Sequence, residues 1–499
     1  MKDAKAWLLG SVLAAVGLVA LLVVGKPGRP GAGPEGVSLL VYCAAGLKPP
    51  VEAAARAYEQ ELHVTVQLQY GGSGTLLSNL KVADRGDLFL AADDSYLQAA
   101  RSNGLVAESV PIARLTPVVA VAKGNPRGFR GIADLGRVSL AFANPDAAAV
   151  GRIARDIFRQ SGQWASIEER VKVFKPTVND VANDIKLGAV DAGIVWDATV
   201  RQYPELEAVE VPEFAGRAQS VSIGVLKSSR NPAAALRFAR YLGAPERGLK
   251  EFSGRGYAVV EGDAWADVPE VVLFSGGVNR VAIEETLARF EHREGARITR
   301  VYNGCGILVS QMKAGQHPDA YFACDVSFMR QVTHLFPSSV NLSSTAMVLL
   351  VPTGNPRNLQ ALGDLAQAGL RIGVANAEQS ALGALTARLL SAHGLLEAVM
   401  VNVRVQTPTA DLLVNQMRSG SLDAVVVYEA NTVNVGGKLT VVRLPDPEAN
   451  ATQPYAVQMN SRHRFLMERL LTTLRTAESR HRFEDSGFKW LGGPDSLGP

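Results

Sequence analysis

The chain has 499 residues, of which 47% are hydrophobic and 20% are charged, and its formal net charge is +3. This length corresponds to three or four ordinary domains of roughly 100 to 200 residues each. Acidic and basic residues are interspersed, so the sequence lacks the basic stripe that nucleic acid requires, and we expect no nucleic-acid partner.

An uncharged apolar run, Trp7 to Val24, follows Lys2 and Lys5 at the N-terminus. The run is just long enough to cross a bilayer with the lysines on the cytoplasmic side. The alternative is a cleaved signal peptide that releases the protein into the periplasm, but the run lacks the usual small-residue cleavage site. We therefore predict that residues 1–24 anchor the protein on the periplasmic side of the cytoplasmic membrane, followed by a flexible Gly/Pro-rich linker at 25–36.

Short β-rich runs alternate with helical patterns from residue 37 onward. The runs are SLLVYCA, VTVQLQY, DLFLAA, VVAVA, VSLAFA and AGIVW, and helices are predicted at 51–61 and 74–83. Such alternation predicts βα units and an α/β fold with a mostly parallel sheet. Because the strands are apolar throughout, we expect both faces of each sheet to be covered.

The second part of the chain repeats the first at an offset of 232 residues. VYCAAGLKPPVE aligns with LFSGGVNRVAIE, GDLFLAADDSYL with PDAYFACDVSFM, and NDIKLGAVDAGIVWDA with NQMRSGSLDAVVVYEA. A period of this length is too long for a solenoid repeat and suits a whole two-lobed domain. We predict one binding domain at 37–267, a second at 268–492, and a short tail at 493–499.

The stretch YGGSGTLL places Ser73 in a glycine-rich turn between a predicted strand and a predicted helix. Unpaired N–H groups and the helix dipole at such a turn bind anions, and Gly72 lets a ligand approach the backbone. A simple helix cap is the alternative. Two further strand-to-helix turns, at Ala45–Gly46 and at Ala148–Ala149, favour a ligand site at the carboxyl ends of the strands.

The first half resembles the periplasmic molybdate-binding proteins of ABC transporters in the segments YCAAGLKPPVEAAARAYEQ, VTVQLQYGGSGTLLSNL, GDLFLAADDSYLQAA and GAVDAGIVW. The resemblance extends more distantly to the second half. It implies a tandem pair of type II periplasmic-binding domains, each of two α/β lobes that close on a small oxyanion such as molybdate or tungstate. It also implies an ABC transporter permease as partner.

The resemblance assigns ligand residues position by position. The family's first hydroxyl ligand falls on Gly46, which has no hydroxyl, and its second falls on Ser73, which fits. Its backbone donor falls near Ala148 and Ala149, and its tyrosine falls on Trp196, which still carries an N–H donor.

The second half departs further from the family pattern. The stretch YNGCGILV has Cys305 where the first half has Ser73, and a thiol is the weaker donor. We expect this half to bind oxyanions more weakly than the first or not at all. It either binds another ligand or serves only in packing or partner contact. Its candidate ligand residues are Ser275, Asn279, Cys305, Ser380 and Tyr428.

Two smaller features leave alternatives open. The three cysteines, Cys43, Cys305 and Cys324, are expected to be small buried side chains, with a Cys305–Cys324 bridge as the alternative. Asp197 and Glu429 follow the predicted aromatic ligands, and are either solvated carboxylates at strand ends or ligands of a metal or oxyanion.

No catalytic motif is present. The seven histidines have no metal-ligand spacing, there is no GxSxG or phosphate-binding loop, and Ser73 has no nearby base to take its proton. We therefore expect no enzyme, no cofactor and no metal site. The main alternative to transport is a membrane-tethered sensor or scaffold that binds another anion or a metal complex.

Overall fold

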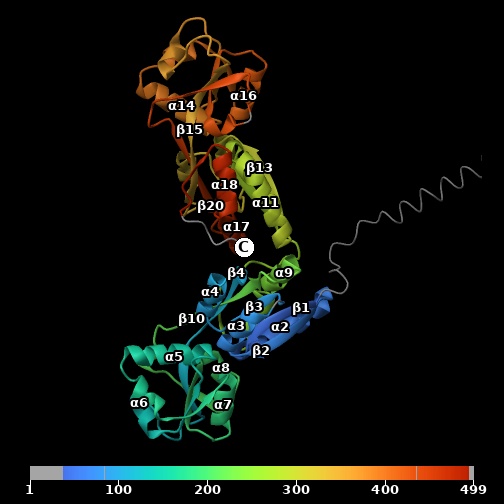
Figure 1. Ribbon diagram of the computed structural model, residues 1–499, viewed down its shortest axis with the longest axis vertical. Coiled ribbons are helices and arrows are strands. Elements are labelled where there is room, and N and C mark those ends of the chain that lie inside the picture. Colours follow the sequence, from blue (N-terminus) through green and yellow to red (C-terminus); the bar gives the residue numbers. More distant parts are fainter. Residues whose placement is uncertain (1–37, 84, 434, 494–499) are drawn as a thin grey trace, which may run out of the picture.

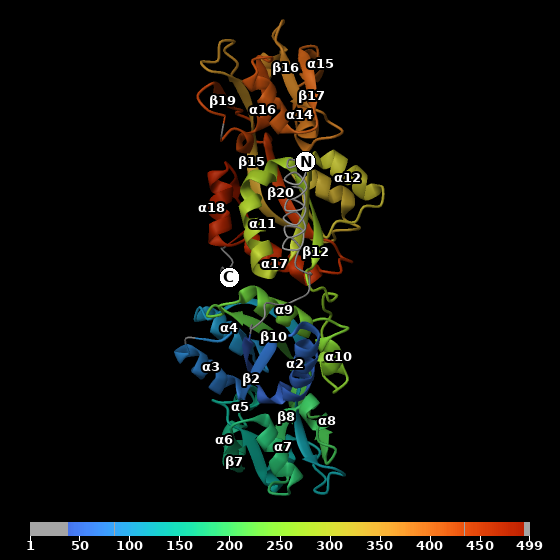
Figure 2. The ribbon, with the colours of Figure 1, turned by 90° about the vertical axis from the view of Figure 1, so that its right-hand side faces the viewer.

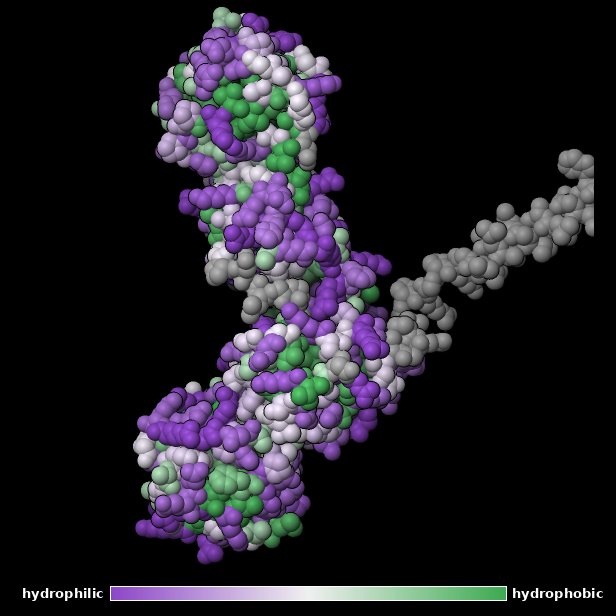
Figure 3. All heavy atoms as spheres, viewed as in Figure 1, coloured by the Kyte–Doolittle hydropathy of each residue, from purple (hydrophilic) through white to green (hydrophobic). Residues whose placement is uncertain are grey.

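The computed structural model describes residues 38–83, 85–433 and 435–493, which form two units that follow one another along the chain (Figure 1). Each unit has an inner lobe near the other unit and an outer lobe at the far end. The two units lie end to end, so the molecule is elongated (Figure 2). The space-filling view shows that this elongated molecule is bent where the two units meet, and that hydrophilic and hydrophobic residues are mixed over the visible face (Figure 3).

The first unit contains one sheet in each lobe. The inner sheet has the order β11-β4-β10-β3-β1-β2 and the outer sheet the order β7-β6-β8-β5-β9. The strands are β1 (Ser38–Ala44), β2 (Thr65–Gly71), β3 (Leu88–Leu90), β4 (Val106–Leu115), β5 (Pro117–Ala122), β6 (Leu140–Ala143), β7 (Val171–Lys175), β8 (Ala192–Trp196), β9 (Leu206–Val209), β10 (Gln219–Leu226) and β11 (Ala258–Val259). The helices are α2 (Lys48–Leu62), α3 (Ser73–Val82), α4 (Asp94–Ser102), α5 (Ala149–Gln160), α6 (Trp164–Glu168), α7 (Val178–Lys186), α8 (Asp197–Arg201), α9 (Pro232–Leu242) and α10 (Gly248–Ser253), with 3₁₀ turns at Ala45–Leu47, Ile132–Arg137 and Pro212–Phe214.

The second unit repeats this arrangement with a continuous sheet through both lobes, in the order β13-β12-β14-β20-β15-β18-β16-β17. Its strands are β12 (Glu270–Gly276), β13 (Arg297–Asn303), β14 (Ala320–Phe322), β15 (Val340–Pro352), β16 (Ile372–Ala375), β17 (Val403–Thr407), β18 (Ala424–Tyr428), β19 (Leu439–Arg443), β20 (Asn450–Val457) and β21 (Lys489–Trp490). Its helices are α11 (Arg280–Glu294), α12 (Cys305–Lys313), α13 (Val326–Met329), α14 (Ala381–Ala392), α15 (Leu396–Met400), α16 (Ala410–Arg418), α17 (Arg464–Leu474) and α18 (Ala477–Asp485), with 3₁₀ turns at Gly277–Asn279, Arg330–Val332, Leu362–Ala366 and Glu429–Asn431.

The predicted apolar runs of the first half form strands, and the two predicted helices are α2 and α3. The central strands β1, β3 and β10 of the inner lobe are mostly buried, as expected for a sheet covered on both faces, whereas the edge strands β2 and β11 are largely exposed or half-buried. The prediction of a mostly parallel sheet holds for part of each sheet: β1 is parallel to β2 and β3, and β6 is parallel to β7 and β8. The strands that connect the lobes run antiparallel to their neighbours, as β10 does to β3 and β4, and β5 to β8 and β9.

The two lobes of each unit are joined by a crossing strand. In the second unit this is β15, which pairs with β20 in the inner lobe and with β18 and β19 in the outer lobe. In the first unit the equivalent path is divided into β4 and β5, and β5 begins at Pro117. Proline has no N–H to donate to a ladder, so it is suited to the point where one sheet ends and the next begins.

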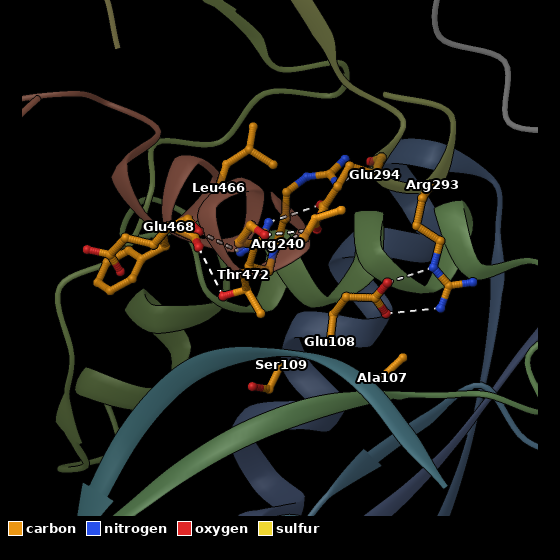
Figure 4. Close-up of polar contacts among 12 residues, drawn as sticks. Ala107, Glu108, Ser109, Arg240, Arg293, Glu294, Leu466, Glu468 and Thr472 are labelled. Atoms are coloured by element: carbon orange, nitrogen blue, oxygen red, sulfur yellow. Dashed lines mark hydrogen bonds and ion pairs between the residues drawn. The ribbon is translucent and has the colours of Figure 1, made fainter. Parts of the chain in front are cut away.

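A joint of charged side chains connects the two units (Figure 4). Glu294 at the end of α11 accepts hydrogen bonds from Arg240 of α9 and from Arg469 of α17, at 3.2 and 2.7 Å. Arg293 donates two hydrogen bonds to Glu108 of β4, at 2.6 and 3.0 Å. Helices α9 and α11 also pack against each other. The joint therefore ties the inner lobes of both units together.

Among the residues that the structure describes, no helix is both long and apolar enough to cross a membrane. The predicted anchor at 1–24 and the linker at 25–36 lie outside those residues, as does almost all of the tail.

Candidate ligand-binding clefts

The Ser73 turn lies where the two lobes of the first unit meet. Ser73 is the first residue of α3 and is 1% exposed. Its hydroxyl oxygen accepts a hydrogen bond from the N–H of Ala92 at 3.1 Å, so its own O–H is not used in that bond. A buried hydroxyl with a proton still to donate is suited to an anionic ligand.

The glycines beside Ser73 bring the lobes into contact. The N–H groups of Gly74 and Thr75 donate to the carbonyl of Ala147 in the outer lobe, at 2.8 and 3.4 Å. A Cβ atom on Gly72 would lie 2.3 Å from the same carbonyl oxygen. The expectation that this turn presents a set of unpaired N–H groups to a ligand is therefore wrong for Gly74 and Thr75, because the opposite lobe already occupies them.

The other predicted ligand residues of the first unit fall on both sides of the same contact. Gly46, next to Ala45 in the 3₁₀ turn after β1, lies beside Trp196: a Cβ on Gly46 would be 3.5 Å from the indole Cδ1 atom. The N–H of Ala148 donates to the carbonyl of Asn144 at 2.8 Å, so it is already paired. Ala149 begins α5, where N–H groups have no partner within the helix, and is the better candidate of the two.

Arg152 and Asp93 form an ion pair between the lobes that sequence analysis missed. Arg152 lies on α5 of the outer lobe, and its Nη2 is 2.5 Å from Oδ2 of Asp93, which precedes α4 of the inner lobe. The guanidinium also lies 4.5 Å from the ring centre of Tyr96. We name this pair the latch. The second unit has Ala384 at the position of Arg152, a difference that the repeat alignment could have exposed.

Asp197 and Glu429 have structural partners. Asp197 accepts hydrogen bonds from the N–H groups of Thr116 and Ala198, at 3.1 and 2.8 Å, and so fixes the crossing between β4 and β5. Glu429 accepts from Arg443 at 2.7 Å. Within the described ranges, no cluster of three or more His, Cys, Asp or Glu side chains is arranged to hold a metal ion.

The second unit repeats the lobe contact with different side chains. The N–H groups of Gly306 and Ile307 donate to the carbonyl of Gln379, at 3.0 and 3.4 Å. Cys305 begins α12 and is fully buried against Cys324. The thiol therefore takes the place of the Ser73 hydroxyl at the equivalent contact.

The remaining predicted residues of the second unit are also buried. Ser275 donates to the carbonyl of Gly276 at 3.2 Å, and Asn279 donates to the carbonyl of Phe322 at 3.1 Å, so both stabilise the end of β12. Ser380 precedes α14 on the opposite lobe. Burial raises the pKa of Tyr428 well above its usual value, and its hydroxyl has no hydrogen-bond partner within the described part of the chain.

A family model of bacterial extracellular solute-binding proteins matches residues 39–253 and again residues 271–489. The chain belongs to this family. The two matches correspond to the two units, so the protein is a tandem pair of solute-binding modules. Members of this family bind solutes, and the chain is a binding protein rather than an enzyme.

Individual relatives align with about half of the chain. A binding protein from Haemophilus influenzae is 31% identical over 229 residues, which are 45% of this chain and 91% of that protein. The molybdate-binding protein ModA of Mycobacterium tuberculosis is 28% identical over 258 residues, 49% of this chain and 97% of that protein. The solved periplasmic molybdate-binding protein of Azotobacter vinelandii is 18% identical, with a TM-score of 0.37, and the match covers 45% of this chain and 100% of that one.

Proposed function

We propose that the protein captures a small tetrahedral oxyanion outside the cytoplasm, molybdate or tungstate in the first instance, and delivers it to an ABC transporter permease. The observation that carries this proposal is the buried Ser73 hydroxyl at the lobe contact, whose oxygen is held by Ala92 while its proton is left to donate. The similarity of one unit to a protein named for molybdate binding supports the choice of anion.

The proposed ligand donors of the first unit are Ser73, the backbone near Ala149 and the indole of Trp196. The turns around them are formed by Ala45, Gly46, Gly72 and Ala148. We take 37–267 and 268–492 as the bounds of the two binding domains. In the second, Ser275, Asn279, Cys305, Ser380 and Tyr428 line the equivalent position. Because a thiol is a weak donor, we expect one tight oxyanion site per chain rather than two.

The test is a calorimetric titration of the full chain with molybdate, tungstate, sulfate and phosphate. Removing one hydroxyl donor from a bound anion costs about 1.5–3 kcal/mol, which corresponds to a loss of affinity of roughly 10- to 150-fold. We therefore expect Ser73→Ala to weaken molybdate binding by this amount. Ser78→Ala, an exposed serine on the same helix, is the matched control and should bind like the unmodified chain.

Unchanged affinity in Ser73→Ala would remove this residue from the site. A stoichiometry of two equal sites would contradict the expected weakness of the second unit.

For the N-terminus we propose that residues 1–24 remain as a membrane anchor on the periplasmic side. Cell fractionation and N-terminal sequencing of the mature chain test this. A product that begins after residue 24 and is released from the membrane would show that the segment is a cleaved signal.

A further inference from the structure

Two of the three cysteines meet at the lobe contact of the second unit. Cys305 begins α12 and Cys324 follows β14, and their Sγ atoms lie 2.7 Å apart. Cys305 is 0% and Cys324 is 5% exposed, and both are free thiols. The third thiol, Cys43, lies on β1 of the first unit. The fold therefore brings Cys305 and Cys324 together and leaves Cys43 apart from them.

The pair replaces an equivalent serine and alanine of the first unit without disturbing the backbone. In the first unit the N–H of Ala92 donates to the Ser73 hydroxyl at 3.1 Å. In the second unit the N–H of Cys324 donates to Sγ of Cys305 at 3.0 Å. The same contact between a helix start and a strand end thus carries two sulfur atoms instead of a hydroxyl and a methyl group.

The space for the second sulfur comes from a compensating change on the neighbouring strand. The first unit has Ala44 at the end of β1, and the second unit has Gly276 at the matching end of β12. A Cβ atom on Gly276 would lie 2.1 Å from Sγ of Cys324 and 3.1 Å from Sγ of Cys305. The glycine is therefore required by the two thiols together.

The electrostatic environment makes the two thiols unequal. Burial opposes ionisation of Cys305, but its hydrogen bond with Cys324 lowers the pKa of the Cys305 thiol. The same hydrogen bond, together with burial, raises the pKa of Cys324. Because a thiolate is the attacking species in thiol–disulfide exchange, Cys305, which ionises more readily, is the expected attacking group of the pair.

We propose that Cys305 and Cys324 are a disulfide-forming pair, oxidised by exchange with a small-molecule or protein disulfide. In this reaction two S–H bonds of the protein and one S–S bond of the oxidant break, and one S–S bond of the protein and two S–H bonds of the released thiols form. Extracellular proteins meet the oxidising conditions under which such bonds persist. The proposal does not depend on whether either cleft binds an oxyanion.

The bridge would join the start of α12 to the end of β14, beside the point where α12 contacts the outer lobe of the second unit. The first unit, with Ser73 and Ala92 at these positions, has no such chemistry. The lobe contact of the second unit would therefore exist in an oxidised form with a disulfide and a reduced form with two thiols. The equivalent contact of the first unit would not change with redox conditions.

The test begins with the full chain, reduced and unfolded in guanidinium chloride so that every thiol is accessible. The chain is refolded in a buffer of oxidised and reduced glutathione, and remaining thiols are blocked with N-ethylmaleimide after acid quenching. Trypsin then separates the cysteines, because Cys305 lies in peptide 301–313 and Cys324 in peptide 314–330. We expect the number of alkylated thiols to fall from three to one, with these two peptides linked and Cys43 alkylated.

Matched variants identify the bond. Cys305→Ser and Cys324→Ala each introduce the residue found in the first unit, and each should abolish the link, while Cys43→Ser should retain it. Dithiothreitol should return all three thiols of the unmodified chain. Three alkylated thiols after oxidative refolding, or links that involve Cys43 as often as the pair, would overturn the proposal.

Discussion

The latch between Asp93 and Arg152 is a side-chain ion pair that joins the inner and outer lobes of the first unit. Asp93 is almost fully buried, and besides Arg152 it accepts hydrogen bonds from the N–H and hydroxyl groups of Ser95, each at 2.8 Å. Its carboxylate is thus held in place by the inner lobe independently of Arg152. The ion pair can exist only when the lobes are in contact, so it stabilises the closed form selectively.

We expect Arg152→Ala to weaken molybdate binding by roughly tenfold. A hydrogen bond to a charged group contributes about 1.5–3 kcal/mol, and the partly exposed guanidinium places this one at the lower end. Calorimetric titration gives the affinity, and small-angle X-ray scattering should show a larger radius of gyration for the variant without ligand. The control is Arg155→Ala on the same helix, which loses only a pair with the exposed Asp146. Equal effects of the two substitutions would show that the latch has no role in closure.

At the scale of elements, the repeated glycine before α3 and α12 is explained by the approach of the opposite lobe. Gly72 has φ −69°, a conformation open to any residue, so it is needed for space rather than for backbone freedom. A Cβ there would meet the carbonyl oxygens of Ala147 and Pro176 at 2.3 and 2.7 Å. Gly304 in the second unit meets Gln379 and Pro408 in the same way, at 2.2 and 2.5 Å.

Gly72→Ala should therefore hold the lobes of the first unit apart. Overpacking of this kind costs about 1–3 kcal/mol, which corresponds to a loss of molybdate affinity of roughly 5- to 150-fold. Titration of the full chain measures this effect. Gly131→Ala is the matched control, because Gly131 also precedes a short helix, has an extended backbone and has no neighbouring atom within 4 Å of an added Cβ. Binding by Gly72→Ala as tight as that of the control would contradict the role assigned to this contact.

The elements themselves could be predicted from the sequence because their causes are local. Apolar runs between glycine-rich turns mark the strands, and Ser73 stands out because a strand, a glycine turn and a helix follow one another within a few residues. The lobe contact depends instead on residues far apart in the chain. The pairing of Gly74 with Ala147 and of Asp93 with Arg152 follows from how the two lobes close, which the repeat and the turn chemistry do not encode. The assignment of ligand residues remains a prediction for the same reason.

At the scale of the whole molecule, Glu294 is the centre of the joint between the two units (Figure 4). Its side chain is 1% exposed, and it is shared by Arg240 of the first unit and Arg469 of the second. Burial by itself would raise the pKa of Glu294, but the two arginines lower it below its ordinary value of 4.5. The carboxyl therefore stays ionised and holds two buried cations that would otherwise repel each other.

Glu294→Gln should uncouple the two units, because it leaves Arg240 and Arg469 buried without their shared counter-charge. Breaking a buried ion pair by removing one partner costs about 3–5 kcal/mol. In differential scanning calorimetry we expect one coupled transition for the unmodified chain and two separated transitions for the variant. Glu285→Gln is the control: this exposed carboxylate on the same helix also pairs with two arginines, Arg289 and Arg482, both within the second unit.

The stability of the joint should also depend on pH, and this dependence should be traceable to the Glu294 carboxyl. Because its pKa is lower in the folded than in the unfolded chain, its contribution to stability is present above pH 4.5 and is lost as the pH falls through the folded value. The coupled transition of the unmodified chain should thus begin to separate on acidification, while Glu294→Gln should show the separated pattern already at neutral pH and lack this step. A neutral-pH transition in Glu294→Gln as coupled as that of Glu285→Gln would show that the shared carboxylate does not hold the two units together, and that the other contacts of the joint, the Arg293–Glu108 pair and the packing of α9 on α11, are sufficient.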